Sequence, residues 1–184
     1  MKNKLLILVL VSSWLFASCA SQPDVYVNSD PSVNVAAYST FNFFNPLGTD
    51  KKGYGSLTSE RLKAATRARL ESLGYTYAET SPELLINFGG QLSDKIDIDT
   101  APTAGGYYGY RTGMYGAWGG YSTYVDQYTE GTVNIDMVDR QANRMVWEGI
   151  VTGRVTDKTR ENIGPVLDAV VAELLADFPA HTAN

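Results

Sequence analysis

The sequence has very few of the side chains that serve as nucleophiles, general bases or metal ligands. Its 184 residues include a single cysteine, Cys19, and a single histidine, His181. His181 follows Pro179 in a short tail, 181–184, which we expect to be frayed and solvated. With Cys19 near the N-terminus and His181 near the C-terminus, we expect no Cys–His pair, Ser–His–Asp triad or Cys/His zinc site inside the domain. We therefore predict a protein that is not an enzyme, with no catalytic residue, no metal site and no cofactor.

Basic residues and long apolar runs are also scarce. The chain has 15 Lys and Arg residues against 20 Asp and Glu, a formal net charge of −5. Because nucleic-acid binding needs a basic stripe, we expect no nucleic-acid partner. After residue 16 no run approaches the roughly 20 apolar residues that cross a bilayer. A chain of this length can bury one core, which predicts a single domain.

The N-terminus has the pattern of an export signal. Lys2 and Lys4 precede an apolar run over 5–16, and small residues follow it. The segment 15–19, LFASC, resembles a bacterial lipobox, in which the cysteine is lipidated and becomes the first residue of the mature chain. We therefore predict a lipid on Cys19. The alternative is a plain secretory signal that leaves Cys19 as a free thiol.

Lipidation at Cys19 defines the expected domain limits and location. Residues 1–18 would be removed, and 19–23 would form a short tether ahead of a domain over 24–180. Two or more acyl chains anchor a protein stably to a membrane. By the sorting rule of enterobacterial lipoproteins, Ala20 indicates release to the outer membrane, so we expect the periplasmic face of that membrane.

Alternating and β-rich segments predict five strands, at 24–29, 38–44, 83–99, 125–138 and 144–155. In the third strand we expect Ile96 and Ile98 to face the core and the neighbouring aspartates to face solvent. The last two strands should form a hairpin through a turn at 139–143. One face of the fourth strand should carry its apolar residues, Val133, Ile135 and Met137.

The first of two predicted helices should span 58–73. Thr58 is its expected N-cap, Leu57 and Leu62 can form a hydrophobic staple, and Gly74 suits the left-handed residue after its end.

The second helix carries an apolar stripe with helical spacing. Pro165 fits its first turn and Pro179 marks its end. The pattern as a whole predicts an α+β fold, an antiparallel sheet of about five strands with both helices packed on one face. The stripe consists of Ile163, Val166, Leu167, Val170, Leu174 and Phe178.

A Gly/Tyr-rich stretch over 101–124 separates the third and fourth strands. It should be a long, flexible hairpin loop, and loops of this length are typically functional or disordered. Aromatic faces suit sugars and small amphiphiles. The candidate binding residues of this loop are Tyr107, Tyr108, Tyr110, Arg111, Tyr115, Trp118, Tyr121 and Tyr124.

The carboxylates give weaker indications. Asp94, Asp97 and Asp99 cluster on the third strand, but their spacing differs from that of a calcium-binding loop, and we expect them to face solvent. Asp139 is expected to cap the hairpin turn rather than to catalyse. Trp147 lies among apolar residues and should pack in the core.

Several segments together resemble the bacterial envelope lipoproteins of domain-of-unknown-function family 4136. The resemblance implies a lipid-anchored α+β domain and brings no established activity or catalytic residue. It covers almost the whole mature chain and rests on 24–26, 38–43, 61–62, 70–75, 82–86, 131–139, 145–149 and 174–179.

Three functional hypotheses follow from the sequence. The first is a non-enzymatic envelope module that binds a partner protein or supports an envelope assembly. The second is a glycan-binding or amphiphile-binding protein that uses the aromatic loop. The third, ranked last, is a carboxylate-dependent hydrolase.

Overall fold

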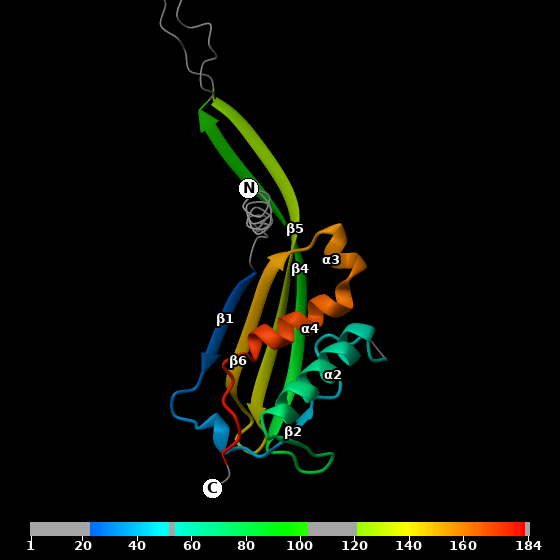
Figure 1. Ribbon diagram of the computed structural model, residues 1–184, viewed down its shortest axis with the longest axis vertical. Coiled ribbons are helices and arrows are strands. Elements are labelled where there is room, and N and C mark those ends of the chain that lie inside the picture. The colour runs from blue at the N-terminus through cyan, green and yellow to red at the C-terminus, as the bar shows by residue number, and fades with distance from the viewer. Residues whose placement is uncertain (1–22, 52–53, 103–120, 183–184) are drawn as a thin grey trace, which may run out of the picture.

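The fold is built on one sheet of six strands, in the order β1-β6-β5-β4-β2-β3 (Figure 1). The structure is a computed structural model, and it describes residues 23–51, 54–102 and 121–182. The strands are β1 (Asp24–Ser29), β2 (Thr40–Phe43), β3 (Thr76–Tyr77), β4 (Leu84–Pro102), β5 (Tyr121–Asp139) and β6 (Arg144–Arg154).

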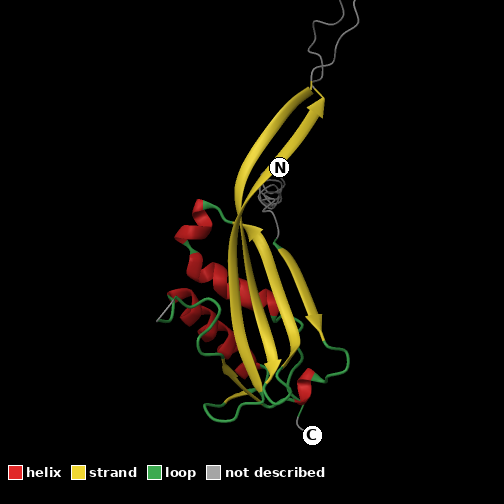
Figure 2. Cartoon of the chain, turned by 180° about the vertical axis from the view of Figure 1, so that it is seen from behind, coloured by secondary structure: helices red, strands yellow, loops and turns green. Residues whose placement is uncertain are grey.

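The helices α2 and α4 lie in front of the sheet in Figure 1 and behind it in Figure 2, so both cover the same face. This agrees with the predicted mixed α and β fold with a one-sided helical layer. A third, short helix precedes α4, and a 3-10 turn follows β1. The bounds are η1 (Val35–Ala37), α2 (Leu57–Ser72), α3 (Asp157–Glu161) and α4 (Ile163–Leu174).

The sheet is mixed rather than antiparallel, which corrects the prediction. β2 pairs in parallel with both β3 and β4. The chain leaves β2, passes through α2 and returns to the sheet, and such a crossover places the next strand parallel to the first. The additional strand, β3, is only two residues long, so it leaves no periodic pattern in the sequence.

The core lies between the helices and one face of the central strands. Ile86, Phe88, Ile135 and Met137 are fully buried there, and Val133 packs against them at partial burial. The predicted apolar face of β5 is therefore confirmed. The opposite face of the sheet is polar, with side chains such as Asn87, Asn134 and Asp136 on it.

The start of α2 differs from the prediction. Ser56 is the N-cap, and its Oγ accepts the backbone N–H of Ser59 at 3.0 Å. Leu57 is 91% exposed, so it forms no staple with Leu62. Gly74, with φ of 91°, ends the helix in the left-handed conformation as predicted.

α4 buries Leu167, Val171 and Leu174. Ile163, which we expected on this face, is 49% exposed because it is the first residue of the helix. The helix ends at Leu174, yet Phe178 in the following turn is still buried. Its ring meets Trp147 edge to face at a centroid distance of 5.3 Å, which confirms Trp147 as a core residue.

The C-terminal residues are docked on the domain, which corrects the expectation of a frayed tail. The backbone N–H of His181 donates to the carbonyl of Leu73 at 2.9 Å, and that of Thr182 donates to Ala36 at 3.0 Å. The His181 ring lies 5.8 Å from the ring of Tyr75. Backbone pairing of this kind depends on the tertiary fold, so residue type alone does not reveal it.

Candidate functional site: the β4–β5 arm

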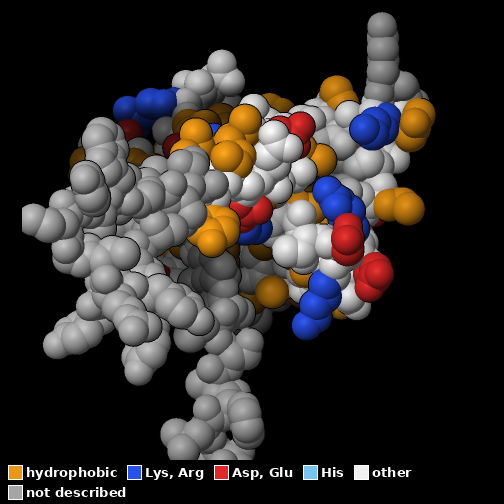
Figure 3. Space-filling view, turned by 90° about the horizontal axis from the view of Figure 1, so that it is seen from above, with side chains coloured by type: hydrophobic (Ala, Val, Ile, Leu, Met, Phe, Trp, Pro, Cys, Tyr) orange, Lys and Arg blue, Asp and Glu red, His pale blue; other side chains and the backbone are white. Residues whose placement is uncertain are grey.

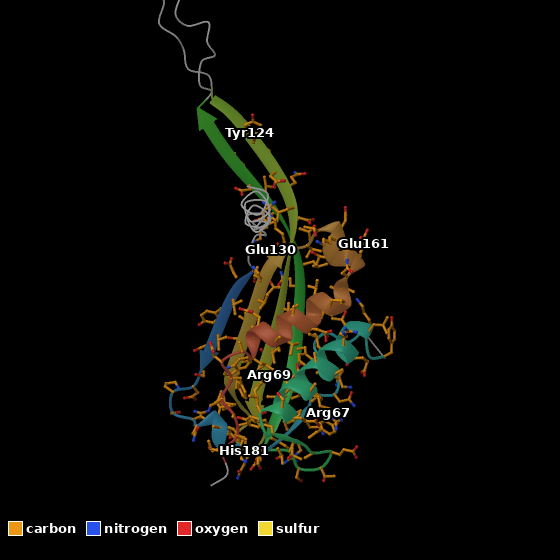
Figure 4. The ribbon with its side chains drawn as sticks, viewed as in Figure 1. Arg67, Arg69, Tyr124, Glu130, Glu161 and His181 are labelled. Carbon is orange, nitrogen blue, oxygen red and sulfur yellow. The ribbon has the colours of Figure 1, made fainter. Side chains whose placement is uncertain are left out.

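The two longest strands continue well beyond the rest of the sheet. Their last nine pairs, from Asp94↔Thr129 to Pro102↔Tyr121, lie past the final β5–β6 pair, Glu130↔Arg154. We call residues 94–102 and 121–129 the arm. At about 3.3 Å per residue, nine pairs span roughly 30 Å. Figure 4 shows Glu130 where the arm leaves the sheet and Tyr124 near its far end.

One face of the arm continues the core face of the sheet, and neither α2 nor α4 extends over it. Strand alternation was predicted correctly, since even-numbered residues of β4 share one face. The burial of Ile96 and Ile98 was predicted wrongly, because each is 61% exposed. α2 and α4 cover only the lower part of the sheet (Figure 1).

Together with their neighbours on this face, these isoleucines form an apolar stripe. Leu92, at the base of the arm, is 69% exposed and Val125 is 59% exposed. Viewed from the arm end, exposed hydrophobic side chains lie beside charged ones (Figure 3). We call Leu92, Ile96, Ile98 and Val125 the stripe.

The other face of the arm is charged. Arg154 forms an ion pair with Asp126 at 2.8 Å, and its guanidinium lies 3.8 Å from the centre of the Tyr128 ring. The hydrogen bond that Arg154 donates to the Asp126 carboxylate raises the pKa of Arg154. Asp97 lies directly opposite Asp126 in the strand pairing, and both are exposed. The arm is therefore an amphipathic ribbon.

An open groove of about 730 Å³ lies at the base of the arm, beside α3. Its charges are largely neutralised within the groove, because Arg160 pairs with Asp157 at 3.0 Å and Arg154 with Asp126. Asp94 accepts the Thr129 hydroxyl at 3.1 Å. The groove therefore presents no concentrated charge to an anion or a metal ion.

The three aspartates of β4 do not converge. Asp94 and Asp97 are three residues apart on one strand, so their side chains lie on opposite faces of the arm. Within the described part of the chain, no cluster of three or more His, Cys, Asp or Glu residues could hold a metal ion.

Most of the predicted binding loop lies outside the described residues, as does Cys19. Tyr121 is the first residue of β5, and Tyr124 lies further along that strand with 65% of its surface exposed. Both strands extend further than expected, so 101–102 and 121–124 belong to the arm. The loop residues outside the described range are Tyr107, Tyr108, Tyr110, Arg111, Tyr115 and Trp118.

A second polar cluster lies at the opposite end of the sheet. Asp139 accepts the backbone N–H groups of Gln141 and Ala142, each at 2.8 Å, so it caps the hairpin turn as predicted. Its other oxygen accepts the Tyr38 hydroxyl at 2.7 Å. Partial burial and this bond raise the pKa of Tyr38 to about 12, while the bonds to Ala142 and Tyr38 lower that of Asp139.

Glu83 completes this cluster and ties β4 to β2. Its carboxylate accepts the backbone N–H groups of Ser39 at 2.6 Å and Thr40 at 3.1 Å, with the Ser39 hydroxyl at 2.8 Å. These bonds, the Ser39 N–H first, lower the pKa of Glu83. Because the carboxylates here are held by turn and strand groups, the cluster has the geometry of a structural clamp.

The described chain is thus a small domain of one mixed sheet and one helical layer, extended by a two-stranded arm. None of its described helices has the length and apolar character needed to cross a membrane. The sequence belongs to the family described as a domain of unknown function, DUF4136, whose profile matches residues 25–180.

Two solved structures illustrate how distant the structural relatives are. One is a PDZ domain protein from Parabacteroides distasonis, with 12% identity and a TM-score of 0.49. The match covers 88% of this chain but only 37% of that protein's length. The other is the PelC dodecamer from Paraburkholderia phytofirmans, with 10% identity, a TM-score of 0.48 and coverage of 89% and 100%. No curated protein matches the sequence.

Proposed function

We propose that this protein is a lipid-anchored, non-enzymatic module of the bacterial envelope, held at the periplasmic face of the outer membrane, and that the arm is its contact surface. The observation that carries the proposal is the arm itself, a ribbon of nine strand pairs beyond the helical layer with an exposed apolar stripe. An isolated two-stranded ribbon is only marginally stable in water, so a contact would stabilise it.

The anchor is supported by the lipobox-like segment 15–19 and by the use of the only cysteine at that position. A thioether-linked lipid leaves the mature chain with no free thiol. Thiol titration in denaturant, with mass analysis of the N-terminal peptide, should therefore find a lipidated Cys19 and no reactive sulfur. An intact leader or a titratable thiol would exclude this part of the proposal.

The contact surface can be tested by photo-crosslinking in intact cells. A benzophenone amino acid in place of Val125, which lies on the stripe, should give crosslinked products. The same group in place of Val27 of β1, which is 49% exposed against 59% for Val125, serves as a control of matched residue type. Equal products from both positions, or none from either, would remove the arm from the proposal.

A glycan or small amphiphile is the second candidate ligand, favoured by the exposed ring of Tyr124. The ring of Tyr128 is less suitable, because the Arg154 guanidinium already stacks on it. Calorimetric titration with envelope glycan fragments would detect such binding. Loss of the signal on Tyr124→Ser would assign it to the arm, and an unchanged signal would place it elsewhere.

A further inference from the structure

The tether and the arm leave the domain at the same end. Asp24, the first residue of β1, pairs with Thr152 of β6. Across the sheet, Thr152 is level with Thr132 of β5 and Gln91 of β4. Pro23 lies beside Gly153, with its Cα 3.9 Å from where a β-carbon of Gly153 would be. The chain therefore enters the domain at the level where the arm begins.

The arm is longer than the tether. Four peptide steps separate Cys19 from Pro23, and a fully extended chain covers at most about 14 Å in that distance. The nine pairs of the arm span roughly 30 Å. If the lipid on Cys19 lies in a bilayer, Pro23 lies within about 14 Å of the bilayer surface. An arm of roughly 30 Å that points towards the bilayer therefore reaches its surface.

The stripe has the chemistry that a bilayer surface accepts. Ile96, Ile98 and Val125 lie together on one face, with Asp94 on the same face nearer the base of the arm, while Asp97 and Asp126 lie on the other. Two-stranded ribbons twist more than wide sheets, so the outer stripe need not face the same direction as the helical layer. Between Asp99 and Asp126 the sequence has one charged residue, Arg111.

The arm's backbone limits how deeply it can enter. Beyond the Val155 N–H, which donates to the carbonyl of Thr129 at 2.8 Å, no other described strand pairs with either edge of the arm. Unpaired N–H and C=O groups cost several kcal/mol each in hydrocarbon, whereas water and lipid head groups can satisfy them at the interface. We propose that the occupant of the stripe is the interfacial layer of the bilayer that holds the Cys19 lipid, which rests on the proposed lipid anchor.

The test uses the full, lipidated chain in phosphatidylcholine vesicles. Ile98→Cys supplies one thiol for an environment-sensitive fluorophore, because the sulfur of a lipidated Cys19 does not react. Met145→Cys is the control. Met145 is an exposed strand residue that pairs with Val138 and lies at the opposite end of the sheet, roughly 40 Å from Ile98 along the strands.

With a nitroxide quencher on the lipid acyl chains, the label at Ile98 should be blue-shifted and lose most of its emission. The label at Met145 should keep its emission. Adding Ile96→Ser and Val125→Ser to the Ile98→Cys chain should restore emission at Ile98, with folding checked by circular dichroism.

Three outcomes would overturn the inference. The first is equal quenching at both labels, and the second is no quenching at either. The third is a blue shift at Ile98 that grows with protein density and resists the lipid quencher, which would assign the stripe to a second copy. Label uptake by the natural sequence would show instead that Cys19 is free and that the proposed anchor itself is wrong.

Discussion

Two isoleucines on the same face of β4 should respond very differently to the same truncation. Ile86 is completely buried under the helical layer, whereas Ile98 on the arm is 61% exposed. Replacing a buried isoleucine with alanine costs about 2–5 kcal/mol, because both the transfer free energy and the contacts around the resulting cavity are lost. Ile98 has only its own ribbon to contact, so Ile98→Ala should cost less than about 1 kcal/mol.

The measurement is urea denaturation of residues 19–184 carrying Cys19→Ser, followed by far-UV circular dichroism. The midpoint should fall strongly for Ile86→Ala and barely for Ile98→Ala, with an unchanged slope in both. A loss above about 2 kcal/mol for Ile98→Ala would mean that the stripe is covered in the isolated domain. That result would contradict both the open arm and the surface proposed for it.

On a membrane, covering the stripe side chains should contribute binding free energy, although these side chains contribute little to folding stability in solution. Burying an isoleucine or valine side chain completely is worth about 1.5–3 kcal/mol. Since Ile96, Ile98 and Val125 are each about three-fifths exposed, covering all three should be worth roughly 3–5 kcal/mol before the cost of ordering the arm. Each 1.4 kcal/mol corresponds to about a tenfold change in arm occupancy.

Three further predictions concern the body of the domain and can be read from the same denaturation curves. Glu83→Gln should lower the free energy of unfolding by about 1 kcal/mol at pH 7. Because the lowered pKa of Glu83 gives stability only while the carboxylate is ionised, this difference between the two proteins should shrink as the pH falls below 4.5, the ordinary pKa of glutamate. A constant difference down to pH 3 would contradict the stabilising role of the ionised carboxylate. Thr66→Val should stabilise by about 1 kcal/mol, since the buried Thr66 hydroxyl has no hydrogen-bond partner, and a loss of stability would show that the hydroxyl is satisfied. Gly149→Ala should destabilise by about 1–3 kcal/mol, because its new β-carbon would lie 2.6 Å from the Trp147 ring and 3.0 Å from Leu174, and wild-type stability would mean that this packing is loose.

The sequence predicts which side chains share a face but not whether anything covers that face. Alternation placed Ile96 and Ile98 on the side of Ile86, and the structure agrees. Alternation is a property of the strand alone, whereas burial depends on how far α2 and α4 extend over the sheet. The sequence therefore predicts burial for Ile96 and Ile98, which are exposed residues of the stripe. The same uncovered apolar face is the reason to propose the arm as a contact surface.

Non-local contacts explain the other differences. The parallel pairing of β2 with β4 depends on where α2 returns the chain, and β3 is defined by two residues against β2. His181 belongs to a polar tail by composition, yet it is held by Leu73 from more than a hundred residues away. For the candidate site, glycine and tyrosine content predicts a binding loop over 101–124, and only its two ends, 101–102 and 121–124, lie within the described strands.

The charged face of the arm opposes edge-to-edge pairing of its strands with other chains. Unpaired strand edges invite pairing with other chains, and natural proteins oppose this with charges. Asp97 and Asp126 lie opposite each other across the strands, and the Arg154 guanidinium, 2.8 Å from Asp126, offsets the repulsion between the two carboxylates. These charged side chains would be costly to bury in an apolar environment. They therefore leave the stripe as the face on which the arm can be covered, and they favour an interface over deep burial.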